Sequence, residues 1–286
     1  MFTQKQTINL NGKLMDFECP KVMGILNITP DSFYDGGRYT TSESIKKRVK
    51  EIINEGADII DAGGMSSRPG ADIIDERTEW YRLEKALDII RNISAEIPVS
   101  VDTFRSNIAH QSIGKYKVGM INDISGGNMD PSIFDVVAEM QVPYIMMHMQ
   151  GTPASMQKHP RYKDFPGDLL EFFQKQNAIL QDKNVHDVII DPGFGFGKTL
   201  DQNYMLLHHL DRFKIIGHPV MVGISRKSMI TNYLNIHASD TLPATSALHT
   251  LALMKGANIL RVHDVAAAKH VTKLMMKTKN SFNANW

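Results

Sequence analysis

Residues 22–28 read VMGILNI, an uncharged run that contains the amide of Asn27 near its end. Seven further short apolar runs follow, and polar side chains come directly after each. These runs are Ile59–Ile60, Val99–Val101, Met120–Ile121, Tyr144–Met147, Val188–Ile190, Val220–Ile224 and Ile259–Leu260. A strand that is buried on both faces of a parallel sheet reads as a continuous apolar run. Eight such strands, each followed by a helical stretch, predict an α/β fold of the (β/α)8 TIM-barrel type.

The polar residues after these runs are expected to meet at one end of the barrel. In this fold the active site lies at the carboxyl ends of the strands. The residues concerned are Asn27, Asp61, Asp102, Asn122, Asp123, His148, Asp191, Lys227, Arg261 and His263. One pattern therefore predicts both the fold and the place of the site.

The whole chain, residues 1–286, is expected to form a single domain, because barrels of about 250 residues commonly do. An Asn-Gly pair at 11–12 predicts a β-hairpin within residues 1–20, which would cap the closed, amino-terminal end of the barrel. Residues 279–286 are expected to form an unstructured tail. Helices are predicted over residues 42–55, 75–95, 131–140, 168–183, 201–210, 244–255 and 263–277.

Composition excludes several classes of function. The formal net charge is +1, so bulk electrostatics give no case for nucleic-acid or membrane binding. No apolar run approaches the ~20 residues of a membrane span, and the first residues lack the apolar core of a signal peptide. Cys19 is the single cysteine, which excludes an internal disulfide and fits a reducing compartment. We therefore expect a cytoplasmic protein.

The stretch DPGFGFGK at 191–198 resembles a phosphate loop but lacks the required spacing. The Walker pattern needs a glycine six residues before Lys198, where Pro192 stands, and the dinucleotide fingerprint does not fit either. We interpret the glycines as a tight strand-to-helix turn. Asp191, at the end of the preceding strand, would then point into the mouth of the barrel.

Asp102, Asn122 and Asp191 would bring hydrogen-bond acceptors from three strand ends to one rim. Two carboxylates and an amide suit a flat heterocycle that carries several N–H donors. Asp58 and Asp61, by contrast, are expected to serve strand packing and helix capping.

Lys227, Arg261 and His263 are expected to supply positive charge. Arg261 and His263 alternate along the last strand and therefore share a face. The loops after the last two strands are the usual phosphate site of such barrels, so we predict an anion site there. His148 is expected to be a rim residue rather than a metal ligand, because no histidine or cysteine pair has zinc spacing.

Taken together, the strand endings resemble the dihydropteroate synthase family, the sulfonamide targets of the folate pathway. The matching motifs are MGILNITPDSFYDGG at 23–37, GADIIDAGG at 56–64, SSRPGA at 66–71, SVDTF at 100–104, INDISGG at 121–127, MHMQGTP at 147–153, DPGFGFGKT at 191–199, GISRKS at 223–228 and RVHDV at 261–265. They occur in the order of the family and include all eight strand ends.

The resemblance implies a transferase that joins p-aminobenzoate to 7,8-dihydropterin-6-ylmethyl diphosphate and releases pyrophosphate. By similarity, the pterin is held by Asp102, Asn122, Asp191, Lys227 and Arg261. The diphosphate and its Mg²⁺ would be held by Asn27, Arg261 and His263, with Asn27 as the metal ligand. The p-aminobenzoate pocket would be formed by Phe33, Ser67, Arg68, Pro69, Phe196 and Ser228. Family resemblance also implies a homodimer.

Two residues depart from the family pattern Glu-Ser-Thr-Arg-Pro-Gly in the loop after the second strand. Here Met65 replaces the glutamate, and Ser67 keeps the hydroxyl but lacks the methyl group of threonine. We expect pterin binding to be unaffected, whereas affinity for p-aminobenzoate or sulfonamides could change.

The residues also indicate a mechanism, because none of them is placed as a general base while two carboxylates lie near the pterin. An arylamine is neutral at neutral pH, so its attack needs no general base. Asp102 and Asp191 are therefore expected to stabilise a carbocation in a dissociative displacement. The predicted catalytic residues are Asp102, Asp191, Lys227 and Arg261. Alternatives are a methyltetrahydrofolate–corrinoid methyltransferase, a non-catalytic pterin-binding paralogue, and an aldolase with a Schiff base on Lys227.

Overall fold

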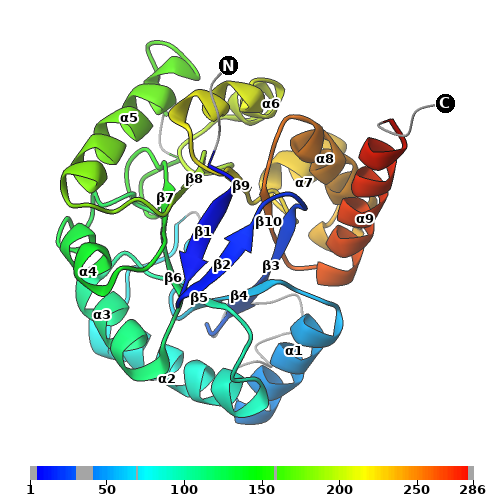
Figure 1. Ribbon diagram of the computed structural model, residues 1–286. Coiled ribbons are helices and arrows are strands. Elements are labelled where there is room, and N and C mark those ends of the chain that lie inside the picture. The colour runs from blue at the N-terminus through cyan, green and yellow to red at the C-terminus, as the bar shows by residue number, and fades with distance from the viewer. Residues whose placement is uncertain (1–4, 30–40, 69, 158–159, 283–286) are drawn as a thin grey trace.

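The protein forms the predicted (β/α)8 barrel (Figure 1). A computed structural model describes residues 5–29, 41–68, 70–157 and 160–282. The barrel strands are β3 (Lys21–Asn27), β4 (Ile59–Gly63), β5 (Val99–Asp102), β6 (Met120–Asp123), β7 (Tyr144–Met147), β8 (Val188–Asp191), β9 (Met221–Val222) and β10 (Ile259–Val262).

All neighbouring strands of the barrel are parallel and follow the order of the chain. The sheet runs from β3 to β8 in one direction and from β3 through β10 to β9 in the other. A single parallel bridge between Ile190 and Val220 joins β8 to the chain just before β9. This contact brings the two edges of the sheet together, so the carboxyl ends of all eight strands surround one mouth.

Helices surround the barrel and bury its outer face. They are α1 (Ser42–Asn54), α2 (Glu76–Ile93), α3 (Ser106–Tyr116), α4 (Ile133–Met140), α5 (Gly167–Asp182), α6 (Leu200–His208), α7 (Ser228–Leu234), α8 (Leu242–Met254) and α9 (Val265–Phe282). Side chains that alternate outward along the strands, such as Val22 and Ile60, pack against this ring in one large core. No helix in the described ranges is long and apolar enough to cross a bilayer.

The structure corrects three details of the sequence-based assignment. Helices α3 and α7 were not predicted, because their local signals are weak. Helix α3 has no side-chain hydrogen bond at its amino-terminal cap, and α7 has only seven residues. Helix α1 is capped by Thr41, the residue before the predicted start, because the Thr41 side chain accepts from the Ser44 amide, and the helix ends at Asn54 rather than at residue 55. Helix α9 continues to Phe282, so the expected tail from residue 279 is helical over its first four positions.

The predicted hairpin caps the amino-terminal end of the barrel. It consists of β1 (Thr7–Leu10) and β2 (Lys13–Asp16), which lie across the barrel axis in Figure 1. Ile8 and Leu10 of the hairpin pack on an inner layer of strand side chains. That layer comprises Met23, Ile59, Met120, Ile145, Ile189, Met221 and Ile259. The closed end is therefore filled with apolar side chains, and the chemistry is left to the opposite end.

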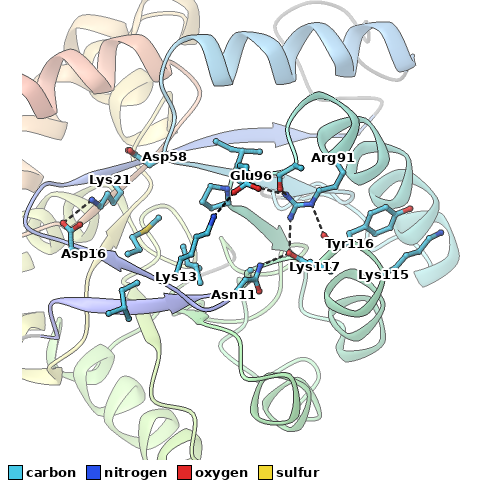
Figure 2. A pocket seen from close by; sticks show the side chains of 17 residues that line it. Asn11, Lys13, Asp16, Lys21, Asp58, Arg91, Glu96, Lys115, Tyr116 and Lys117 are labelled. Carbon is cyan, nitrogen blue, oxygen red and sulfur yellow. Dashed lines mark hydrogen bonds and ion pairs between the residues drawn. The ribbon is translucent and has the colours of Figure 1, made fainter.

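A cavity of about 800 Å³ lies beside the hairpin, at the closed end (Figure 2). Its charged side chains have partners close by: Lys13 pairs with Glu96, and Arg91 donates to the backbone carbonyls of Tyr116 and Lys117. Asn11 also donates to the carbonyl of Lys117, at 2.9 Å. The bonds of Lys13 and Asn11 fasten the hairpin to the barrel, and those of Arg91 join α2 to the end of α3.

Candidate active site

Strand alternation directs polar side chains into the carboxyl end of the barrel. Successive residues of a strand point to opposite faces, so residues two apart share a face. Met23, Ile59 and Ile259 belong to the inner apolar layer, and the next inward positions on β4 and β10 are Asp61 and Arg261. The same alternation places Asn122 inward on β6, two residues after Met120.

Arg261 is the centre of the cluster. Its Nε donates to Asp61 Oδ2 at 2.7 Å, and its Nη2 donates to Asp102 Oδ2 at 2.7 Å. Asn122 Nδ2 also donates to Asp61 Oδ2, at 3.0 Å. Four residues from β4, β5, β6 and β10 are therefore joined by three hydrogen bonds, although they are separated by up to 200 positions in the sequence.

Asp61 corrects the sequence-based interpretation. Asp58 does serve packing, since it accepts from the Val22 amide and from Lys269. Asp61 instead belongs to the site cluster, and its side chain has no exposed area. Its position inside an otherwise apolar strand was the available signal, because an aspartate is almost never fully buried without a partner.

Lys227 and Asp191 form the neighbouring part of the rim. Lys227 donates to the carbonyl of Phe194, and its Nζ lies 4.6 Å from the centre of the Phe196 ring. Gly195 and Gly223 lie against its side chain, since a Cβ at either position would be in ordinary van der Waals contact with it. The attraction between Asp191 and Lys227 opposes the cost of burying both charges.

The glycine-rich segment after β8 is the tight turn that the sequence predicts. Gly193, Gly195 and Gly197 all have positive φ. Buried Lys198 organises this turn, because its Nζ donates to the carbonyls of Gly193 at 2.8 Å and Phe196 at 3.0 Å. His148 lies 3.2 Å from the same Nζ and is held edge-on against Phe172, so it is a supporting rim residue as expected.

The predicted anion site lies where β10 meets the loop after β9. His263 Nδ1 is 3.2 Å from Ser225 Oγ, and Arg226 forms a two-pronged ion pair with Asp264. Burial, together with the nearby charges of Arg226 and Arg261, lowers the pKa of His263 to about 3. His263 is therefore a neutral hydrogen-bonding group at neutral pH, whereas the sequence suggested a cation.

Asn27 ends β3 beside the acidic cluster. The absence of a side chain at Gly63 lets it approach: a Cβ there would lie 3.3 Å from Asn27 Oδ1 and 3.5 Å from Asp102 Cβ. Among the described residues, no group of three or more histidine, cysteine, aspartate or glutamate side chains could hold a metal ion. An amide oxygen next to an anion site does fit Mg²⁺, which commonly takes one or two protein ligands together with substrate phosphates.

The expected p-aminobenzoate residues are only partly placed. Phe33 and Pro69 lie outside the described residues. Phe196 is buried beside Lys227, whereas Ser228 is exposed at the start of α7. In the loop after β4, Met65 is buried, Ser67 is half-buried and Arg68 is exposed. The Gly70 amide of this loop donates to the carbonyl of Pro153, so the loops after β4 and β7 are in contact.

The electrostatics of the rim predict a narrow pH optimum. Burial raises the pKa of Asp102 to about 7; Arg261 opposes this effect, and the charge of Asp61 adds to it. Burial lowers the pKa of Lys227 to about 8, although Asp191 opposes it. Asp102 is therefore ionised only above about pH 7, and Lys227 is protonated only below about pH 8.

If substrate capture requires both charges, kcat/KM should be greatest between these two values and should fall about tenfold per pH unit on either side. Initial rates with limiting substrate across the neutral range test this expectation. Lys227→Arg keeps its charge at high pH and should lose only the alkaline limb. A flat profile for the unaltered chain, with the fold intact by circular dichroism, would contradict the assignment.

The fold and the rim together are typical of a barrel enzyme whose acceptors, donors and cations gather at the carboxyl ends of its strands. The model of a family described as pterin binding enzyme matches residues 23–263, and the chain belongs to that family. The chain is 38% identical to a dihydropteroate synthase of Haemophilus influenzae. The alignment extends over 275 residues and covers 95% of this chain and 98% of that protein. Within the family, the chain groups with the dihydropteroate synthases.

Solved structures agree with this placement. A Yersinia pestis dihydropteroate synthase in complex with a sulfonamide drug superimposes with a TM-score of 0.91 at 34% identity, covering 96% of this chain and 99% of that one. A Xanthomonas albilineans dihydropteroate synthase with 4-aminobenzoic acid gives a TM-score of 0.88 at 34% identity, covering 97% and 99%. The resemblance seen in the sequence motifs is thereby confirmed.

Proposed function

We propose that this chain catalyses the condensation of 7,8-dihydropterin-6-ylmethyl diphosphate with p-aminobenzoate to give 7,8-dihydropteroate and pyrophosphate. The cluster of Arg261 with Asp61, Asp102 and Asn122 carries the proposal, because it places acceptors and a cation at one mouth. The full-length similarity to dihydropteroate synthases supports the same reaction. The alternatives considered from the sequence have no such support.

The pterin is proposed to lie against Asp102, Asn122, Asp191, Lys227 and Arg261. Its amino and ring N–H groups need acceptors, which the two carboxylates and the amide provide. Its carbonyl oxygen and ring nitrogens need donors, which Lys227 and Arg261 provide. Arg261 is held by neighbouring carboxylates and Lys227 by the carbonyl of Phe194, so their positions are set before substrate arrives.

Breaking the carbon–oxygen bond to diphosphate is the difficult step. Electrons leave with the diphosphate, and a methylene carbocation conjugated to the pterin remains. The Asp102 carboxylate, and secondarily Asp191, stabilises that positive charge more strongly than the neutral ground state, which is the condition for acceleration. The arylamine nitrogen then bonds to the carbon and releases a proton to solvent. A secondary isotope effect at the methylene that indicates a tight, associative transition state would exclude this order of events.

The leaving group is proposed to lie near Asn27, Arg261 and His263. Arg261 contributes positive charge, and neutral His263 contributes a hydrogen bond. Asn27 would hold Mg²⁺ by its amide oxygen. The ion, when bound, supplies positive charge against the diphosphate oxygens.

The p-aminobenzoate is proposed to lie between the Phe196 side and the loop that carries Ser67 and Arg68, with Ser228, Phe33 and Pro69 completing the pocket. The aromatic ring of Phe196 provides an apolar wall, and the Arg68 guanidinium suits a carboxylate. Because Met65 is buried, its departure from the family pattern acts on the packing beneath this loop and brings no exposed charge.

Release of pyrophosphate tests the proposed function. We expect release only when pterin diphosphate, p-aminobenzoate and Mg²⁺ are all present, with one dihydropteroate formed per pyrophosphate. Omitting each component in turn, and removing the metal with a chelator, are the controls. Equal release without p-aminobenzoate would indicate simple hydrolysis, and no release with all components would refute the proposal.

A homodimer is proposed from the apolar surface of α6 to α9. Large apolar side chains are exposed on α7, α8 and α9, among them Tyr233, Leu251, Met254 and Leu274. Helix α8 contacts α9, and α6 contacts α7, so these residues lie on one side of the barrel (Figure 1). Sedimentation that gives the mass of one chain would contradict the dimer.

We propose the cytoplasm as the location of the protein, because the exposed thiol of Cys19 suits a reducing compartment.

A further inference from the structure

We propose that Asp61 is a positioning residue that sets the orientation of the Asn122 amide and of Arg261, and thereby decides which edge of a heterocycle the site accepts. This inference rests on the proposed function and extends it to Asp61, a residue to which the family resemblance assigns no role. Asp61 lies one layer beneath the rim, and its side chain has no exposed area, whereas those of Asp102 and Arg261 are 10% and 17% exposed.

The first step concerns the amide of Asn122. A carboxylate only accepts hydrogen bonds, so the group that faces Asp61 Oδ2 at 3.0 Å must be the nitrogen of the amide. The oxygen must then face the other way. Within the described part of the chain, Asn122 Oδ1 is buried and has no hydrogen-bond partner. A buried acceptor without a partner is rare, and here a donor on the ligand would satisfy it.

The second step concerns Arg261. Its Nε edge is held by Asp61 from β4, and its Nη2 is held by Asp102 from β5. A guanidinium is planar, so two anchors on different strands fix both its position and its plane. Without Asp61, the Nε edge would lose its anchor, and the guanidinium could turn about the bond to Asp102.

The third step concerns the alternative that Asp61 merely stabilises the fold. A buried ion pair is weak grounds for stability, because desolvation offsets most of its attraction. Asp61 uses a single oxygen for both of its hydrogen bonds, and among the described residues its other oxygen has no partner. This is a costly arrangement for packing alone. The arrangement is explained if Asp61 serves to fix the orientation of the Asn122 and Arg261 side chains.

An exchange of the two side chains tests the proposal. Asp61→Asn should let the new amide donate to Asn122 Oδ1 and so occupy the acceptor meant for the ligand. Asn122→Asp should set two carboxylates against each other. Each single substitution is expected to lower kcat/KM for the pterin diphosphate by about ten- to a hundredfold. KM for p-aminobenzoate should change by less than about twofold.

The double variant Asp61→Asn with Asn122→Asp restores one amide, one carboxylate and the same net charge. The amide at position 61 can accept from Arg261 and donate to position 122, whose carboxylate still presents an acceptor to the ligand. We expect kcat/KM to recover to within about fivefold of the unaltered chain. Purely additive losses would overturn the proposal, because they would mean that Asp61 contacts the ligand itself or acts only on the fold.

Asp58→Asn is the matched control. Asp58 lies three residues before Asp61 in the chain, at the closed end of the barrel, and its carboxylate pairs with Lys269. We expect this substitution to leave KM for the pterin diphosphate unchanged, whatever its effect on thermal stability. The unaltered chain is assayed alongside the variants: its failure to release pyrophosphate would refute the proposed function, whereas full activity without recovery in the double variant would refute only the role of Asp61.

Discussion

Arg261→Ala should lower kcat by about a thousandfold and should also destabilise the barrel. The guanidinium is the shared partner of Asp61 and Asp102, at 2.7 Å from each. Its removal takes positive charge away from the leaving group and leaves two buried carboxylates facing each other. Breaking a buried pair by removing one partner typically costs about 3–5 kcal/mol.

The expected loss of stability follows from the tertiary structure, because only the structure shows that both carboxylates share this guanidinium. Single-turnover rates and thermal unfolding, measured on the same preparation, test both parts. Arg261→Lys keeps the charge but cannot hold both carboxylates in one plane, so it should recover more stability than activity. Near-normal turnover in Arg261→Ala would reject its assigned role.

Asp102→Asn should show the opposite combination, a large loss of activity without a loss of stability. The amide keeps the shape of the carboxylate but cannot stabilise a positive charge, so we expect kcat to fall by about a hundredfold or more. Burial raises the pKa of Asp102 to about 7, which means that its charged form is costly in the folded protein. Arg261 retains Asp61 as its counter-ion in this variant.

The sign of the stability effect follows from that pKa. An acid whose folded pKa is raised favours the folded state at low pH, and this contribution is lost as pH rises to about 7. Above that value the charge of Asp102 opposes folding, so the neutral amide should leave the free energy of unfolding unchanged or raise it. Thermal unfolding at about pH 8 measures this. A melting temperature well below that of the unaltered chain would show that Asp102 stabilises the fold.

The barrel could be predicted because its signals are local and repeated. Each strand carries its own apolar run, and the Asn-Gly pair marks the hairpin within a few residues. Elements with weak local signals were missed, as α3 and α7 show, since their boundaries depend on packing against neighbours rather than on caps. The end of α9 was placed too early for a related reason. Its last turns carry few apolar residues, so the apolar periodicity ends before the helix does.

The gathering of polar side chains at one rim could be predicted for residues that are the last or next to last of their strands, as are Asp102, Asn122, Asp191 and Arg261. Asp61 was misread because it lies in the middle of a strand, where a polar residue suggests a packing role. The neutrality of His263 was also hidden, since its pKa depends on burial and on Arg226 and Arg261 nearby.

The sequence by itself determined the barrel, the end at which its polar side chains gather and most residues of the hydrogen-bonded cluster around Arg261. Strand periodicity and strand endings are properties of short segments, and a single chain displays them directly. Only the tertiary structure decided how Arg261 divides its guanidinium between Asp61 and Asp102, and which way the Asn122 amide faces. Hydrogen-bond direction and charge pairing depend on distances between strands that closure of the barrel brings together, and no local pattern encodes those distances.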